Sequence, residues 1–171
     1  DCASEGLLLM TNDTRWAHHL LDPASNVEKV YHVQIDSHPD QALLARLQDG
    51  VVDDGERLAA KSVALLRLGE RNAWLEVVLT EGRNRQIRRM MALSGVNVLR
   101  LVRVAVGTLR LGDVAKGDFR HLTASERACL AAGSRADRGP KRRPLEEQPF
   151  ERKRLRKAGR SNEEPQRLRS L

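Results

Sequence analysis

The segment Glu81–Met91 carries four arginines within seven residues, and the positions between them are mostly apolar. Three arginines, at positions 85, 88 and 89, have the spacings of three and four that place side chains on one side of a helix. The opposite side is apolar and carries Ile87, Met90 and Met91. Such a helix folds by packing its apolar side against a core, so its guanidinium groups face outward. They donate hydrogen bonds in a planar fork that suits phosphates and carboxylates, although an arginine-rich face can equally be ordinary solvated surface.

The net charge of +7 comes from the last part of the chain. Residues 134–171 contain 13 basic and 6 acidic residues, whereas basic and acidic residues balance in residues 1–133. The segment 134–171 also has four prolines and few apolar side chains, so it is predicted to be a disordered basic tail. A flexible basic tail attracts polyanions without sequence preference, and that attraction weakens as salt rises. Many charged tails are simply solvated, but the clusters at 141–143 and 152–154 favour RNA as a partner.

Residues 1–133 have the patterns of a mixed α and β domain. Runs with apolar alternation or apolar continuity predict strands over 6–10, 27–35, 51–60 (broken by a turn at 53–55), 62–68, 73–79 and 96–106, with 107–111 continuing the last one after a break. Helical periodicity and capping residues predict helices over 14–21, 39–47, 81–91 and 123–132. Because the strands do not alternate regularly with helices, the predicted fold class is α+β with a largely antiparallel sheet.

Several classes of function have no support in the sequence. Neither a P-loop nor a dinucleotide-binding fingerprint is present, and the adjacent His18 and His19 do not have a metal-ligand spacing. No apolar run is long enough to cross a membrane, and two cysteines, Cys2 and Cys129, imply no disulfide framework. We therefore expect a cytoplasmic protein without a metal or a membrane partner.

Four stretches, in chain order, resemble the motifs of one enzyme family. Asp1–Asp13 is similar to the D-x-x-[ST]-[ES]-G-L-L-x-[LM]-T-N-[DN] pattern of bacterial ribosomal RNA pseudouridine synthases. Val27–Val33 is similar to their tyrosine-bearing strand, and Glu81–Met90 to their E-G-x-N-R-Q-[IV]-R-R-M motif. Their closing segment is matched by 99–103, 106–111 and 117–123. The chain thus resembles the RsuA family. The short spacing between its first two motifs and the residues of its third favour the branch that acts on large-subunit RNA.

The resemblance implies a catalytic domain over residues 1–133 and an isomerase that needs no cofactor. Family enzymes break the N-glycosidic bond of one uridine in ribosomal RNA, rotate the uracil and rejoin it through carbon. Asp1 corresponds to their essential aspartate, Arg88 to the arginine that pairs with it, and Tyr31 to the tyrosine that packs against the uracil. A carboxylate beside a guanidinium stays ionised even when bound RNA desolvates it, and the target base must leave its stack.

The resemblance and the basic pattern together predict which residues contact RNA, namely Lys29, Arg83, Asn84, Arg85, Arg89 and Arg103. Arg100 and Arg103 are three residues apart on one strand, so at most one of them is expected to face RNA. Taken alone, Tyr31 could be a core aromatic and Asp1 a frayed terminus; only the motif context favours catalysis. The alternative hypothesis is a non-catalytic RNA-binding or ribosome-assembly module on the same scaffold.

One departure from the family concerns the start of the chain. In the family, the aspartate of the first motif follows a G-R-L step and further strands of the central sheet, and many members begin with an S4-like domain. The chain is therefore expected to be an N-terminally truncated piece of a longer monomeric protein, with an incomplete sheet.

Overall fold

The computed structural model describes residues 3–132 of the 171-residue chain. The chain separates into two compact units, Asp1–Arg138 and Gly139–Leu171, and every described residue belongs to the first. The predicted basic tail (134–171) and the catalytic candidate Asp1 lie outside the described residues, so both stay predictions.

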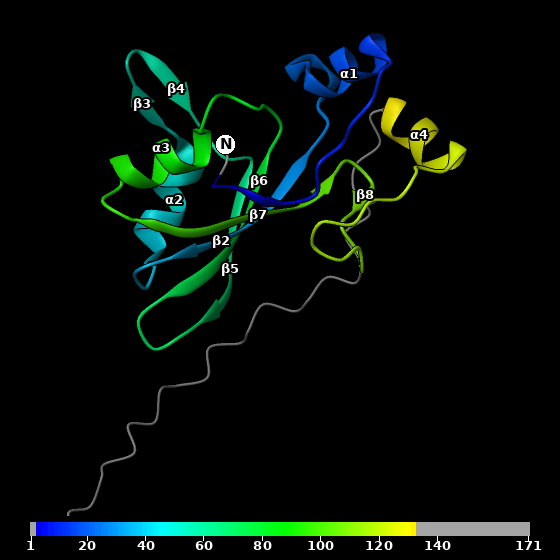
Figure 1. Cartoon of the computed structure of the whole chain (residues 1–171). Helices are drawn as coiled ribbons and strands as arrows, with labels where there is room; N and C mark the ends of the chain where they lie inside the picture. The colour runs from blue at the N-terminus through cyan, green and yellow to red at the C-terminus, as the bar shows by residue number, and fades with distance from the viewer. Residues whose placement is uncertain (1–2, 133–171) are drawn as a thin grey trace, which may run out of the picture. The chain divides into compact units, whose positions relative to one another are not determined.

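A mixed sheet forms the centre of the first unit (Figure 1). Its strands lie in the order β1, β7, β2, β6, β5, and β8 pairs with β7. Their bounds are β1 Glu5–Gly6, β2 Lys29–Ile35, β5 Ser62–Leu68, β6 Ala73–Leu79, β7 Val98–Val106 and β8 Leu109–Arg110. All pairings are antiparallel except that of β1 with β7. The prediction of an α+β fold with a largely antiparallel sheet is confirmed.

The pairing of β2 with β7 contains an irregularity that matters for the site. Lys29 pairs with Val106 and Tyr31 with Arg103, so β7 advances three residues while β2 advances two. This extra residue in β7 is a β-bulge, which leaves one residue without a partner in the ladder. As a result, Arg103 lies directly opposite Tyr31, where paired residues share a face of the sheet.

Two hairpins follow the sequence patterns closely. The strands β5 and β6 have the predicted bounds, and the amide of Gly69 donates to the carbonyl of Asn72, 2.8 Å away, to close the turn between them. A second, small sheet consists of β3 (Val51–Asp53) and β4 (Glu56–Leu58). Asp54 and Gly55 have φ of 48° and 78°, as a tight hairpin turn requires.

The described residues also form four α-helices, namely α1 Thr14–Leu21, α2 Gln41–Asp49, α3 Gln86–Leu93 and α4 Ala124–Ala131. A 3-10 turn, η1 (Pro23–Ser25), follows α1. Asp13 caps α1 by accepting hydrogen bonds from the amides of Arg15 and Trp16. The predicted bounds of α1 are confirmed, because Asp22 and Pro23 end the helix as expected.

The apolar residues form two clusters. The first joins β2, β5 and β6 to α2 and α3, and it contains Ile35, Leu47, Leu75 and Met90, all nearly inaccessible to solvent. Each such side chain contributes about 1.5–3 kcal/mol by its burial. The second cluster brings α1 and α4, which lie side by side (Figure 1), onto the end of β7 and the start of β8. Its buried members are Leu20, Val27, Val106, Leu109 and Leu130.

The structure corrects two strand predictions. Residues 6–10 were expected to form a buried strand, but β1 has two residues, and Leu8 and Met10 beyond it are 71% and 88% exposed. Among the described residues, this segment pairs only with β7, so apolar composition alone did not bury it. Residues 107–111 do not continue β7: the chain turns at Gly107, with φ of 54°, and β8 runs back along it.

Two helix starts also differ from the prediction. The helix expected from Pro39 begins at Gln41, because the Asp40 carboxylate accepts a hydrogen bond from the Leu43 amide at 2.7 Å and acts as the N-cap. The helix expected over 81–91 begins at Gln86. Arg83, Asn84 and Arg85 therefore lie in the preceding loop, where Arg85 has a left-handed φ of 49°.

The predicted capping box of α4 gives a pH-dependent contribution to stability. Thr123 and Glu126 exchange side-chain-to-backbone hydrogen bonds, and Arg120 donates to the Glu126 carboxylate. The Arg120 hydrogen bonds, and then the Thr123 amide, lower the pKa of Glu126 from 4.5 to about 2. Because the folded-state pKa is depressed, the carboxylate stabilises α4 above pH 4.5, and we expect this to be lost as the pH falls from 4.5 to 2.

The prediction is checked by following the Thr123 amide resonance between pH 6 and pH 2. Glu126→Gln should remove the transition from this amide while leaving signals of α2 unchanged. A Thr123 transition near pH 4.5 in the unmodified chain would contradict the assigned cause.

Candidate functional site

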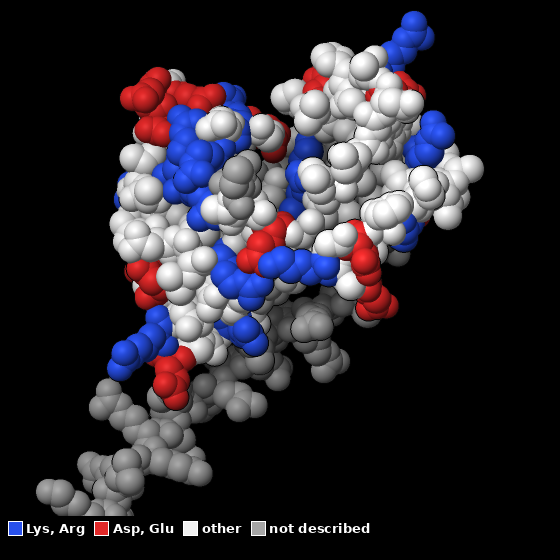
Figure 2. All heavy atoms as spheres, viewed as in Figure 1, with Lys and Arg blue, Asp and Glu red and all other residues white. Residues whose placement is uncertain are grey.

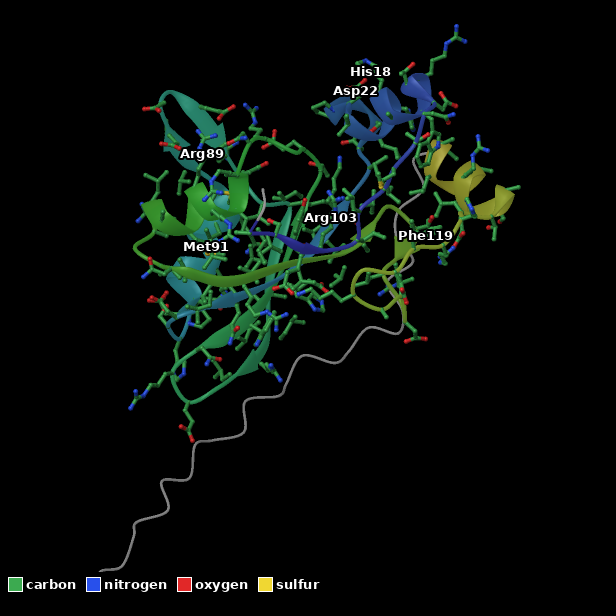
Figure 3. The ribbon with its side chains drawn as sticks, viewed as in Figure 1. His18, Asp22, Arg89, Met91, Arg103 and Phe119 are labelled. Atoms are coloured by element: carbon green, nitrogen blue, oxygen red, sulfur yellow. The ribbon has the colours of Figure 1, made fainter. Side chains whose placement is uncertain are left out.

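The guanidinium group of Arg88 reaches from α3 toward the start of the chain. Its Nη2 donates to the carbonyl of Ala3 at 2.8 Å, and its Nη1 lies 3.5 Å from the carbonyl of Val98 in β7. The helix is fixed by its apolar side, because Ile87, Met90 and Met91 are buried in the first core cluster, as predicted (Figure 3 labels Met91). Arg88 is thus held firmly against the residues that follow the candidate Asp1 in the chain.

Tyr31 lies in the middle of the sheet, on β2. It pairs with Val77 of β6 on one side and with Arg103 of β7 on the other. It is partly buried and packs against the first core cluster. Lys29 is two residues earlier on the same face of β2, as the alternation predicted.

Lys29 is an unusually buried cation, with 6% of its surface exposed. It sits where the two core clusters meet, since it pairs with Leu79 of the first and Val106 of the second. Its Nζ is 3.4 Å from the carbonyl of Thr80. Burial, and secondarily the charge of Arg103, lower the pKa of Lys29.

Arg103 lies beside Lys29 in a hollow of the surface. Its Nε donates to the carbonyl of Leu7 at 2.7 Å, which links β7 to the segment after β1. Lys29 and Arg103 both line a cavity of about 270 Å³ whose other walls come from α1 and residues 8–11. Figure 2 shows basic side chains within a hollow between the part built on α3 and the part built on α1, and Figure 3 places Arg103 in this central region.

The opposite face of β7 carries Arg100. Its guanidinium binds the Glu5 carboxylate through hydrogen bonds of 3.0 and 2.9 Å and lies 5.7 Å from the centre of the Trp74 ring. Glu5 has a lowered pKa, mainly because Arg100 donates to it. Arg100 and Arg103 therefore face different sides, as their spacing predicted, and Arg103 is the one on the side of Tyr31.

Arg83 and Arg89, both nominated for RNA contact, pair with carboxylates of the chain itself. Arg89 donates to Asp53 and, at 2.8 Å, to Glu56, while Arg83 donates to Glu56 and, at 2.9 Å, to Glu81. The hydrogen bond from Arg83, and then that from Arg89, lower the pKa of Glu56. Figure 2 shows acidic and basic side chains together over the β3–β4 hairpin and α3, and Figure 3 labels Arg89 there.

This ion-pair cluster fixes the loop before α3 to the β3–β4 hairpin. The buried Gln86 amide group donates to the Glu81 carboxylate at 2.8 Å and to the Ala59 carbonyl at 3.1 Å. The carbonyl of Asn84 lies 3.4 Å from Arg89 Nη1, and Arg85 is exposed at the start of α3. The RNA-binding roles of Arg83, Asn84, Arg85 and Arg89 stay predictions.

Sequence reasoning missed two parts of this arrangement. The carboxylates of the β3–β4 hairpin are about thirty residues from the arginines that they bind, and no local pattern signals such a pairing. The apolar wall of the cavity, which includes Trp16 and Leu21, comes from a helix that appeared in the sequence only as a core element. Its amphipathic pattern could have suggested an exposed apolar edge at Leu21, which is 73% exposed.

Within residues 3–132, no three His, Cys, Asp or Glu side chains are grouped so that they could hold a metal ion. No helix in that same range is both long and apolar enough to cross a membrane.

The chain is similar to proteins of one family. The family model described as RNA pseudouridylate synthase matches residues 1–93. A ribosomal large subunit pseudouridine synthase E of Xanthomonas campestris pv. campestris is 43% identical over 135 residues, covering 70% of this chain and 72% of the relative. An uncharacterized RNA pseudouridine synthase of Rickettsia prowazekii is 38% identical over 123 residues, covering 72% of this chain and 52% of the relative.

A solved structure agrees with these relatives. The crystal structure of a pseudouridylate synthase superposes with a TM-score of 0.59 and 31% identity, covering 70% of this chain and 52% of that protein. The chain therefore spans about half the length of that protein and of the Rickettsia relative.

Proposed function

This chain belongs to the RNA pseudouridylate synthase family, and from that premise we propose that it carries the catalytic centre of an enzyme that isomerises one uridine of ribosomal RNA to pseudouridine. The observation that carries the proposal is the placement of Arg88. It binds the carbonyl of Ala3, two residues after Asp1 in the chain, so a cation lies beside the segment that follows the candidate aspartate.

The proposed chemistry assigns one task to each of three side chains. The Asp1 carboxylate, kept ionised by Arg88, acts at the ribose carbon that loses its bond to uracil N1. Either it bonds to that carbon and is displaced when carbon 5 of the uracil attacks, or it stabilises the cation there without bonding. Tyr31 packs against the extruded uracil, and its phenol assists removal of the proton at carbon 5 after the new carbon–carbon bond forms. The uracil N1 gains a proton, so the reaction is a net isomerisation without a cofactor.

The proposed substrate is large-subunit ribosomal RNA. The relatives from Xanthomonas campestris and Vibrio parahaemolyticus, 43% and 38% identical, both bear the name ribosomal large subunit pseudouridine synthase E. We further propose that the protein acts as a monomer in the cytoplasm. The reducing interior of a cell suits a chain with only two cysteines.

The proposal is tested by mapping pseudouridine in ribosomal RNA from cells that lack the gene encoding this chain. We expect one uridine of the large-subunit RNA to lose its modification, and the restored gene to recover it. An unchanged map would reject the enzymatic function and leave the RNA-binding module as the alternative. A lost site in small-subunit RNA would instead reject the substrate assignment.

A further inference from the structure

The cavity beside β2 and β7 has an unusual composition. Its volume is about 270 Å³, and the charged side chains that line it are Lys29 and Arg103. Thr11 supplies a hydroxyl group, and the other lining residues are apolar or aromatic. A basic floor with apolar walls is the composition expected of a site for a ligand that is anionic at one end and apolar at the other.

The two cations of the floor have no carboxylate partner within residues 3–132. The neighbouring Glu28 shows the contrast: it is also buried, at 4% exposure, but Lys61 neutralises it. A buried ammonium group beside a half-buried guanidinium group is unfavourable unless an anion joins them. The pKa of Lys29 is lowered, first by burial and then by the charge of Arg103, as expected where no carboxylate lies beside the two cations.

The mouth of the cavity is apolar and open to solvent. Leu8 and Leu21, which both line the cavity, are 71% and 73% exposed, and Trp16 is a further lining residue. Large apolar side chains left exposed around a pocket commonly mark a binding surface. Nucleobases pack well against such side chains, because each base has an apolar face.

We propose that this cavity binds one nucleotide of the RNA next to the target uridine, with its phosphate on Lys29 and Arg103 and its base against the wall of Leu8, Trp16 and Leu21. This inference rests on the proposed function, since it takes RNA as the ligand. Tyr31 and Arg88 are not among the lining residues, but Arg103 pairs with Tyr31, so the cavity lies next to the place assigned to the target uracil. It positions the RNA backbone beside the target without selecting the base, since every base can pack against such a wall.

The chain's two tryptophans allow a direct test. Trp16 lines the cavity, whereas Trp74 packs between Arg67 and Arg100, whose guanidinium carbons lie 5.5 and 5.7 Å from its ring centre. The full chain labelled with 5-fluorotryptophan is titrated with uridine 5′-monophosphate and followed by ¹⁹F NMR. We expect the Trp16 resonance to shift and the Trp74 resonance to stay. A shift of Trp74 alone would overturn the site.

Variants and simpler probes separate the two halves of the ligand. Lys29→Met and Arg103→Gln should each weaken binding of uridine 5′-monophosphate about tenfold, because each removes a charge-assisted hydrogen bond, and the control Arg67→Gln should leave it unchanged. Inorganic phosphate or uridine alone should bind at least about tenfold more weakly than the nucleotide. Phosphate binding as tight as the nucleotide would overturn the role of the apolar wall. Unchanged affinity in both variants would overturn the phosphate site.

Folding of the variants is checked by their unfolding midpoints. Should Arg103→Gln fail to fold, Arg103→Lys keeps the charge and should retain nucleotide binding within about threefold, while Lys29→Met preserves volume and removes a buried charge. Loss of binding in Arg103→Lys equal to that in Lys29→Met would contradict a charge-based site.

Whether the bound nucleotide belongs to RNA is tested with a single-stranded oligouridylate. It should displace uridine 5′-monophosphate, and the slope of log affinity against log salt should fall by about 0.7 in either variant, as expected for one lost phosphate contact. Failure to displace the nucleotide would overturn the assignment to RNA. Nucleotide binding at this cavity in a protein that isomerises no uridine would reject the proposed function alone, whereas isomerisation without nucleotide binding would reject this inference alone.

Discussion

Arg88→Met is expected to lower the rate constant of pseudouridine formation by about two to three orders of magnitude, as removal of a single oriented stabilising donor does in other active sites. Arg88 projects from a helix anchored by buried Met90 and Met91, so its position is rigid. Its guanidinium binds the Ala3 carbonyl at 2.8 Å, close in the chain to Asp1. Methionine keeps most of the side-chain volume but removes the cation that we propose keeps Asp1 ionised.

The measurement is single-turnover release of tritium from RNA labelled at carbon 5 of uridine. Arg88→Lys retains the charge without the planar fork and should lose about tenfold. Asp1→Asn should abolish release, and adding Arg88→Met to it should cause no further loss, because the two groups act as a unit. Near-normal turnover in Arg88→Met would refute the catalytic role of the Arg88 cation. The lost hydrogen bonds are worth only about 1–3 kcal/mol, so the variant is expected to stay folded. Unfolding of the variant would instead show that Arg88 acts mainly in stability.

Gly6→Ala is expected to lower the free energy of unfolding by about 3 kcal/mol and to remove activity as well. Gly6 has φ of 95°, and a Cβ placed there would lie 2.3 Å from the Arg103 carbonyl oxygen and 2.9 Å from the Arg103 amide nitrogen. Both contacts are with backbone, which cannot swing aside as a side chain can. The strands β1 and β7 must therefore separate, and β1 holds the residues that follow Asp1.

Gly55→Ala is the matched control for this substitution. Gly55 also has a positive φ, 78°, but a Cβ there would meet nothing within 4 Å. We expect Gly55→Ala to lower the free energy of unfolding by about 1 kcal/mol, from backbone strain alone. Urea denaturation measures both variants. Equal losses would show that backbone strain, rather than the contact with Arg103, determines the effect at Gly6.

Local patterns predicted the elements whose signals are local. The hairpin of β5 and β6 has the predicted bounds because alternation and the turn at 69–72 specify it together. The capping box of α4 was found because Thr123 and Glu126 are three residues apart and interact with each other. Side-chain periodicity also assigned Arg100 and Arg103 to different faces.

Pairings between distant segments could not be predicted in the same way. β1 joins β7 across nearly one hundred residues, and its two-residue length follows that contact rather than the apolar run that comes after it. The ion pairs of Arg89 with Asp53 and Glu56 could not be predicted, because these carboxylates belong to a hairpin with no sequence relation to α3. Periodicity shows which face a residue occupies, but it does not show what stands opposite.

The extra residue in β7 makes the length of this strand a determinant of the site in its own right. In a regular ladder, Val106 and Arg103 would have opposite orientations, because three is an odd step. The bulge reverses that parity and brings Arg103 to the side of Lys29 and Tyr31. A homologue that lacks this one residue would therefore exchange the surroundings of Arg100 and Arg103 although both arginines are kept, so an alignment gap at this point carries more information than most substitutions.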